Sequence, residues 1–270
     1  MRVLVVFHFY YREQLDFFIE KLKNICDCTW DLIVTFNTIH DEDKLKLLKL
    51  KSDAIFYPVE NAGYDVWPFI SVLKNIDTCE YDIIVKLHTK SYTNGHFTIN
   101  GVYFRGFQWR DELVDALLKN KKTFRQMLSC FKTNKMVGMY CSRLLLTRSM
   151  CLEDTNILDE ELKKLGVKNC DKLYCAGTMF AISPKVLRPI YEIDYSVDMF
   201  RGAMQSNSSG TLAHAYERIF SILAGVNGFK IKISNPNIQY IYKLIYAFCF
   251  DVYHEIRCVG PIRRFLVKNL

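Results

Sequence analysis

Continuous apolar runs and helical periodicity alternate over the first two thirds of the chain. The runs are rich in Val, Ile, Leu and Phe, without the polar alternation of a half-exposed strand. The segments between them repeat their apolar residues every three or four positions, which is typical of amphipathic helices. This alternation indicates an α/β fold with a mostly parallel sheet and helices on both faces. The expected strands are Arg2–Phe9, 31–37, 54–59, 82–87, 136–141, 173–182 and Lys230–Ile233.

The same periodicity predicts the helices of the domain. They are expected over residues 13–25, Asp41–Leu50, 64–75, 110–119, 123–131 and 211–223. Residues 91–106 mix Gly, Asn and Thr with aromatic residues and follow neither period. We therefore expect a long loop there, and a loop of this length in a compact domain is usually functional.

The C-terminal segment, residues 236–270, differs from the preceding domain, residues 1–235. Its apolar residues fall on one helical face and are followed by basic residues with no acid among them: Ile241, Leu244, Ile245, Phe248 and Val252, then Arg257, Arg263, Arg264 and Lys268. Such a tail can lie on an anionic membrane surface. The alternative is a helix that packs on the domain with its basic residues in solvent. The longest apolar run, residues 244–250, is far shorter than the ~20 residues that span a bilayer.

Composition narrows the function classes only a little. Half of the residues are hydrophobic, which supports a sizeable core and argues against disorder. The net charge of +7 permits phosphate-bearing partners. The basic residues are spread along the chain and form no stripe, so we do not expect nucleic-acid binding. The ten cysteines are scattered and no signal peptide precedes the first strand, so reduced thiols in a cytoplasmic protein are expected.

Asn61-Ala-Gly-Tyr-Asp65 leads from the third predicted strand into a helix. Gly63 permits a backbone conformation or a close approach that a Cβ atom would block. Asp65 is expected either to cap the helix or to accept hydrogen bonds from a ribose or a base. Tyr64 offers a ring face to a base or sugar, whereas Trp67 is expected to pack in the core.

Lys86-Leu-His-Thr-Lys90 ends the fourth predicted strand with groups that can carry positive charge. Residues 86, 88 and 90 share one face if the strand continues. Burying several such groups is costly unless an anion balances them, and a diphosphate is a natural counter-charge. The alternative is a solvated strand end. Because ligands of parallel sheets bind at the carboxyl ends of strands, His8 and Asn61 are expected in the same crevice, which suits a phosphate-bearing sugar donor.

Two more sets of polar residues lie on predicted helices. Trp109-Arg110 begins a helix directly after the long loop, and Arg110 is expected either to clamp a phosphate or to pair with a nearby aspartate. In the last helix, His214, Glu217 and Arg218 stand at positions i, i+3 and i+4. A carboxylate flanked in this way is a candidate general base or substrate clamp. The alternative is a salt-bridged face that holds the helix to its neighbour.

Five motifs, taken in order, resemble the rhamnan synthesis protein F family. They are Asn61-Ala-Gly-Tyr-Asp-Val-Trp-Pro-Phe69, Tyr81-Asp-Ile-Ile-Val-Lys-Leu-His-Thr-Lys-Ser91, Trp109-Arg110, Ala176-Gly-Thr-Met-Phe180 and Gly210-Thr-Leu-Ala-His-Ala-Tyr-Glu-Arg218. The resemblance spans roughly residues 1–235. It implies a GT-A-like, Rossmann-like glycosyltransferase that moves a sugar, with rhamnose as one candidate, from a nucleotide donor to a growing surface polysaccharide.

The resemblance also bears on metal use. GT-A enzymes generally hold a divalent metal through Asp-x-Asp after the fourth strand, where this chain has His88-Thr89-Lys90. A cationic pair can take over the metal's work on the leaving diphosphate. We therefore expect no required metal or other cofactor, with Mg²⁺ or Mn²⁺ as the less favoured alternative. Tyr64 stands where the family usually has Arg. Ser209 stands where the family usually has Asp, which leaves Glu217 as the candidate base or the protein as a diverged enzyme.

The resulting hypothesis is a glycosyltransferase at the cytoplasmic face of the membrane. Its expected partners are a nucleotide-sugar donor and a glycan or lipid-linked acceptor, and the alternative is a non-catalytic nucleotide- or glycan-binding module of the same fold. The predicted catalytic residues are Glu217, His214 and Arg218. The predicted donor-binding residues are His8, Asn61, Gly63, Tyr64, Asp65, Lys86, His88, Lys90, Trp109 and Arg110.

Overall fold

A seven-stranded sheet forms the centre of the computed structural model, which describes residues 1–202, 210–226 and 228–234. The strand order is β11-β7-β10-β4-β1-β2-β3. Only β10 runs antiparallel to its neighbours in this sheet, so the mostly parallel α/β sheet is confirmed. The strands are β1 (Arg2–Phe9), β2 (Thr29–Phe36), β3 (Ile55–Pro58), β4 (Ile83–His88), β7 (Val137–Cys141), β10 (Phe180–Ile182) and β11 (Lys230–Ile233).

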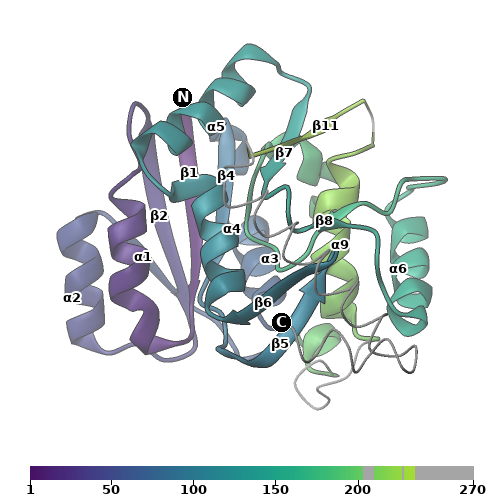
Figure 1. Cartoon of the computed structure of the whole chain (residues 1–270), viewed down its shortest axis with the longest axis horizontal. Coiled ribbons are helices and arrows are strands. Elements are labelled where there is room, and N and C mark those ends of the chain that lie inside the picture. The colour runs from purple at the N-terminus through teal and green to yellow at the C-terminus, as the bar shows by residue number, and fades with distance from the viewer. Residues whose placement is uncertain (203–209, 227, 235–270) are drawn as a thin grey trace, which may run out of the picture.

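Helices cover both faces of this sheet, as predicted (Figure 1). On one side lie α1 (Leu15–Leu22), α2 (Asp41–Leu50), α4 (Gln108–Leu118) and α5 (Lys121–Thr133). The other side carries α3 (Val66–Asn75), α7 (Arg188–Tyr191) and α9 (Leu212–Leu223), with α6 (Leu152–Lys164) packed on α9. The described residues also include four short 3₁₀ helices: η1 (Arg12–Gln14), η2 (Thr78–Glu80), η3 (Pro184–Leu187) and η4 (Val197–Phe200).

The order of the strands creates a crevice between β1 and β4. From β1 the chain moves outward to β2 and β3, and then returns to place β4 on the other side of β1. His8 and His88 are register partners at the carboxyl ends of these two parallel strands. The strand order reverses direction at this point, with β2 and β3 on one side and β10 and β7 on the other, and open parallel sheets bind ligands at such a switch point.

The predicted long loop at residues 91–106 is wrong, because these residues form a hairpin. Strand β5 (Thr93–Ile99) pairs with β6 (Val102–Gly106) in a separate two-stranded sheet. The turn is Asn100-Gly101, with φ of 51° and 73°. Asn-Gly is the pair that tolerates two consecutive positive φ angles, so this dipeptide was the signal for a hairpin.

The predicted strand at residues 173–182 is two strands in different sheets. Strand β9 (Tyr174–Cys175) pairs with β8 (Leu146–Thr147), whereas β10 joins the main sheet. The break lies at Gly177 and Thr178, whose φ angles of 93° and 50° end the extended backbone. Helix α6 was not predicted, although acids in its first turn and lysines in its last are helix-end signals.

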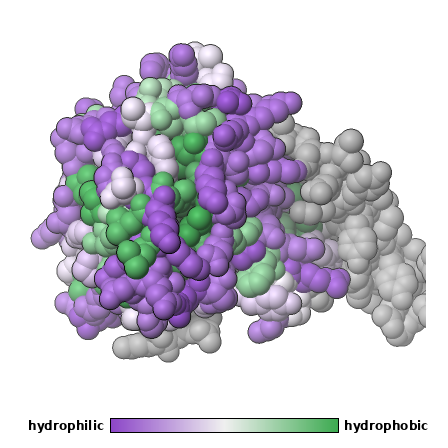
Figure 2. All heavy atoms as spheres, turned by 90° about the vertical axis from the view of Figure 1, so that its left-hand side faces the viewer, coloured by the Kyte–Doolittle hydropathy of each residue, from purple (hydrophilic) through white to green (hydrophobic). Residues whose placement is uncertain are grey.

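Figure 2 shows the side of the molecule on which α1 and α2 lie, where hydrophilic side chains surround a smaller apolar area. The exposed large apolar side chains of α2 and β3 are Leu45 and Ile55. Within the described ranges, no helix is both long and apolar enough to cross a bilayer. The predicted membrane-binding tail, residues 236–270, lies outside the described residues and stays a prediction.

Candidate functional site

A pocket of about 580 Å³ opens at the carboxyl ends of β1 and β4. Most of the predicted site residues line it: His8, Asn61, Tyr64, Asp65, His88, Lys90, Trp109, His214 and Glu217. The pocket also has lining residues for which no role was predicted: Tyr10, Tyr11, Thr89 and Ser91. The remaining predicted residues, Gly63, Lys86, Arg110 and Arg218, are not among those that line it.

Lys86 is buried inside the fold and has an internal counter-ion. It lies in the middle of β4 with 1% of its surface exposed, and its ammonium pairs with the carboxylate of Asp65. It also donates to the carbonyl and hydroxyl oxygens of Thr178, at 3.1 and 3.3 Å. The prediction that Lys86 faces a donor phosphate is therefore wrong. Asp65 supplies the counter-charge that a buried lysine requires.

Asp65 neither caps α3 nor keeps a free carboxylate. It occupies the N-cap position of the helix, but its side chain makes no capping hydrogen bond. Its Oδ2 instead accepts from Lys86 and, at 2.6 Å, from the hydroxyl of Thr178. Burial alone would raise the pKa of Asp65, but the Lys86 charge and these hydrogen bonds hold it well below its ordinary value. Asp65 thus contributes an ionised carboxylate to the lining of the pocket.

A strained corner turns Tyr64 toward the pocket. Gly63 and Tyr64 have φ of 59° and 53°, a left-handed conformation that is rare for a bulky side chain. A Cβ atom on Gly63 would lie 2.8 Å from the Cβ of Phe200, so the glycine serves close packing. The Tyr64 ring lies 5.8 Å from the ring of His214, centroid to centroid. Trp67 packs against Phe200 at 5.5 Å, which confirms its predicted core role.

The two histidines at the strand ends are neutral at neutral pH. His8 hydrogen-bonds through Nδ1 to the Thr35 hydroxyl at 3.1 Å, and burial lowers its pKa from 6.5 to about 4. The Nδ1 atom of His88 lies 3.4 Å from Asp65 Oδ2 without a hydrogen bond, and burial lowers the pKa of His88 well below 6.5. The expectation that His88 is a cation is wrong, although a neutral imidazole can still hydrogen-bond a ligand.

Among the described residues that line the pocket, Lys90 is the one lysine or arginine. Its Nζ lies 3.4 Å from the centroid of the Trp109 ring, which is a close cation–π contact. The indole N–H of Trp109 donates to the carbonyl of Ala176 at 3.3 Å. A Cβ atom on Gly177 would lie 2.8 Å from Trp109 Nε1, so glycine is needed for this packing. Burial lowers the pKa of Lys90, and the charge of Glu217 opposes that change.

Thr89 fixes the loop that follows β1. Its hydroxyl oxygen accepts hydrogen bonds from the backbone amides of Tyr10 and Tyr11, at 3.0 and 2.9 Å. Its own amide donates to the carbonyl of His8 at 3.0 Å, which extends the pairing of β1 with β4 by one residue. The lone pairs of the Thr89 hydroxyl therefore serve the chain itself, and the two tyrosines are held at the edge of the pocket.

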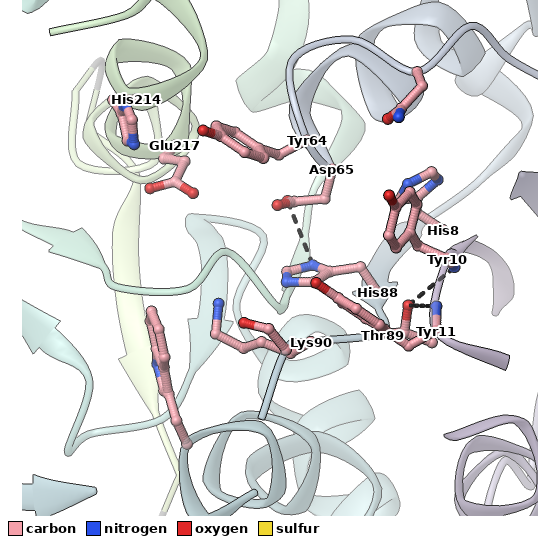
Figure 3. Close-up of a pocket in the computed structure, with 13 residues that line it drawn as sticks. His8, Tyr10, Tyr11, Tyr64, Asp65, His88, Thr89, Lys90, His214 and Glu217 are labelled. Carbon is pink, nitrogen blue, oxygen red and sulfur yellow. Dashed lines mark hydrogen bonds and ion pairs between the residues drawn. The ribbon is translucent and has the colours of Figure 1, made fainter. Parts of the chain in front are cut away.

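Helix α9 brings a carboxylate to the far wall of the pocket. Its N-cap residue Thr211 accepts from the His214 amide at 3.4 Å, and its hydroxyl contacts His214 Nδ1 at 2.8 Å. One turn on, Glu217 has 23% of its side chain exposed. Burial raises the pKa of Glu217, and nearby Lys90 opposes that rise. Figure 3 shows Glu217 and Lys90 facing the cavity from opposite walls.

The two predicted arginines are structural. Arg218 is 7% exposed and donates to Asp154 on α6 at 2.5 Å, so the alternative of a salt-bridged face is the one observed for this residue. Arg110 pairs with Asp111 at 2.7 Å. Its guanidinium lies between two rings, 3.8 Å from the Phe17 centroid and 4.1 Å from that of Phe107. Neither guanidinium lines the pocket.

Comparison with known sequences places most of the chain in one family. The profile of rhamnan synthesis protein F matches residues 1–229. Two curated relatives, each described as uncharacterized protein WxcX, come from two strains of Xanthomonas campestris pv. campestris. Each is 26% identical over 234 residues, which make up 84% of this chain and 32% of the relative. The chain thus spans about a third of the length of the curated relatives that it matches.

Two solved structures to which the chain is similar share little sequence with it. Staphylococcus aureus TarS residues 1–349 is 9% identical, with a TM-score of 0.47 over 96% of this chain and 66% of that chain. Glucosyl-3-phosphoglycerate synthase from Mycobacterium tuberculosis is 11% identical, with a TM-score of 0.38 over 92% of this chain and 79% of that chain.

Proposed function

Since the chain belongs to the rhamnan synthesis protein F family, we propose that it is a GT-A-like glycosyltransferase of surface-polysaccharide synthesis. The reaction moves a sugar, with rhamnose as one candidate, from a nucleoside-diphosphate donor to a hydroxyl group of a glycan or lipid-linked acceptor. The observation that carries the proposal is the pair of Lys90 and Glu217, which face each other across the pocket at the ends of β1 and β4 (Figure 3).

The pocket offers distinct surroundings for the parts of such a donor. Its volume of about 580 Å³ lies within the range of small-molecule sites. Near the end of β1, the rings of Tyr10 and Tyr11 and the neutral imidazole of His8 suit the nucleoside. The Lys90 ammonium lines the pocket at the end of β4. It suits the diphosphate because an ammonium donates strong, charge-assisted hydrogen bonds to phosphate oxygens.

The proposed chemistry uses the two facing groups in opposite roles. The Glu217 carboxylate takes the proton of the acceptor hydroxyl, whose oxygen then attacks the anomeric carbon of the donor sugar. The bond from that carbon to the diphosphate oxygen breaks, and its electron pair leaves with the diphosphate. The Lys90 ammonium offsets the negative charge that develops there. A raised pKa makes the Glu217 carboxylate a stronger base than an exposed one.

The residues at the end of β4 support the proposal that no divalent metal is required there. The Lys90 ammonium would repel a cation, and the Thr89 hydroxyl already accepts two backbone amides. In the part of the chain that the structure describes, no three His, Cys, Asp or Glu side chains are grouped for metal binding. From these side chains we propose that Lys90 offsets the negative charge of the leaving diphosphate, as a metal does in other GT-A enzymes.

Thermal-shift measurements test the donor site. UDP, GDP and dTDP, each with and without Mn²⁺ and with EDTA as a metal-free arm, are added to wild type and to Lys90→Met. We expect at least one nucleoside diphosphate to stabilise the wild type without metal and to stabilise Lys90→Met much less. If no nucleoside diphosphate shifts the transition, the proposal fails, and a strict Mn²⁺ requirement would refute the role given to Lys90.

The second candidate function is a non-catalytic nucleotide- or glycan-binding module of the same fold. It is favoured by Ser209, which stands in the sequence where the family resemblance leads us to expect an acid. Glu217→Gln separates the two functions. An enzyme loses transfer, or slow donor hydrolysis, but keeps nucleotide binding. A binding module shows no turnover with any nucleotide sugar in the wild type, and the variant binds as the wild type does.

A further inference from the structure

The main chain of Lys90 is held by a side chain from a distant part of the sequence. Gln14, the last residue of η1, is 1% exposed. Its Nε2 donates to the carbonyl of Lys90 at 2.6 Å, and the amide of Lys90 donates to its Oε1 at 3.2 Å. One carboxamide therefore satisfies both backbone groups of Lys90, as the next residue of a neighbouring strand would.

This arrangement takes over where the sheet ends. The ladder between β1 and β4 closes at His8 and His88, and the Thr89 amide adds one more bond to the His8 carbonyl. After Phe9 the chain leaves the sheet and turns into η1. Gln14 comes back from η1 to the position beside Lys90, so its side chain replaces the strand that has turned away.

The position of the Lys90 ammonium depends on how its backbone is held. A lysine side chain has four rotatable bonds, so a charge at its tip is well placed only if both ends are fixed. The Trp109 ring holds the ammonium end at 3.4 Å, and the Gln14 carboxamide holds the backbone end. Gln14 itself does not line the pocket, so it does not touch a ligand there.

We propose that Gln14 is a positioning residue, which fixes Lys90 so that its ammonium meets the diphosphate of the donor. The proposal rests on the function proposed above, because it gives Lys90 the role of diphosphate ligand. It assigns a role to a residue outside the pocket. It also predicts that the effect of Gln14 on ligand binding passes through Lys90 alone.

A double-mutant cycle tests this dependence, with UDP binding measured by calorimetry on the full chain, or GDP or dTDP if that is the diphosphate that binds. Gln14→Met keeps the length of the side chain and removes both hydrogen bonds, so it is expected to weaken binding about tenfold. In the Lys90→Met background the same change should have no further effect. An equal loss in both backgrounds, or no loss in the wild-type background, overturns the proposal.

Two further variants keep the test decisive. Gln108→Met is the matched control, because Gln108 is exposed and does not line the pocket, and it should bind as wild type does. Gln14→Glu keeps the volume and the acceptor oxygen but loses the donor to Lys90. If Gln14→Met does not fold, Gln14→Glu takes its place in the cycle, with a several-fold loss expected and the same outcomes overturning the proposal.

A second measurement needs no ligand and so separates this inference from the proposed function. After reductive ¹³C-methylation, the Lys90 resonance is identified by its loss in Lys90→Met, and the Trp109 ring beneath it should shift it upfield. In Gln14→Met the resonance should move toward those of exposed lysines. An unchanged resonance overturns the role of Gln14. If no nucleoside diphosphate binds the wild type, the proposed function fails, while this spectrum still decides whether Gln14 positions Lys90.

Discussion

Lys86 and Asp65 form a buried ion pair that joins the middle of β4 to the corner before α3. Thr178 completes the arrangement, because it donates to Asp65 and accepts from Lys86. Asp65 also lines the pocket, so the ion pair lies directly behind the pocket wall. Lys86 and Asp65 thus balance each other's charge within the protein, which supports the proposal that Lys90 is the cation that meets the ligand.

Removing one member of this pair should be strongly destabilising. Asp65→Asn leaves the Lys86 charge buried and uncompensated, and we expect a loss of about 3–5 kcal/mol in the free energy of unfolding by urea titration. Replacing both residues, as Asp65→Asn with Lys86→Met, should restore most of that loss. The control is Asp171→Asn, which breaks an exposed pair with Arg148 and should cost less than about 1 kcal/mol. Similar losses at Asp65 and Asp171 would contradict the prediction.

Gly63 should not tolerate a side chain. Its Cβ atom would meet Phe200 at 2.8 Å, and its φ of 59° disfavours any L-residue. We expect Gly63→Ala to lower the free energy of unfolding by about 2–4 kcal/mol, through overpacking and backbone strain together. Gly166→Ala isolates the strain, because Gly166 has φ of 70° and open space around it. The packing argument fails if the two alanine variants lose equal stability in the same urea experiment.

The sequence predicts best those elements that one local pattern determines. The strand Arg2–Phe9 is predicted to the residue, because the apolar run at residues 3–7 is rich in β-branched valine and too short for a typical helix. The helix Asp41–Leu50 was predicted as well, with acids at its start and a lysine near its end. The hairpin escapes the periodicity pattern because the residues around the Asn100-Gly101 turn mix polar, glycine and aromatic side chains without a regular alternation.

Partnerships between distant residues could not be predicted from the pattern. Lys86, His88 and Lys90 share a strand end, and their alternation predicts one cationic face. The fold sends them to three environments: an ion pair with Asp65, an uncharged imidazole and a cation over Trp109. Each outcome is set by a residue from another element, and burial then decides which group keeps its charge. The sequence shows which polar side chains stand at the strand end, but it does not show which of them is ion-paired, which is uncharged and which keeps its charge in the pocket.

The buried His8 should make the protein sensitive to mild acid. Its pKa is about 4 in the folded chain and 6.5 as the ordinary value, so the unfolded state binds the proton more tightly. The contribution of His8 to the free energy of unfolding is therefore fully present above pH 6.5. It falls by about 3 kcal/mol in total as the pH drops from 6.5 to 4. Urea titrations across this range should show a smaller loss for His8→Gln. His40→Gln, at an exposed histidine, should follow the wild type, and parallel curves for all three would exclude His8 as the cause.

The pH dependence of transfer should report the two facing groups of the pocket. In the proposed reaction the rate needs Glu217 deprotonated, and burial raises its pKa, so the acid limb should lie above the ordinary 4.5. It also needs Lys90 protonated, and burial lowers its pKa, so the alkaline limb should lie below the ordinary 10.5. Glu217→Gln should lower kcat by about 10²–10⁴-fold and remove the acid limb, whereas Lys90→Met should remove the alkaline limb.

Glu153→Gln, on an exposed carboxylate of α6 outside the pocket, is the control and should keep both limbs. If Glu217→Gln retains the acid limb and most of the rate, another group is the base.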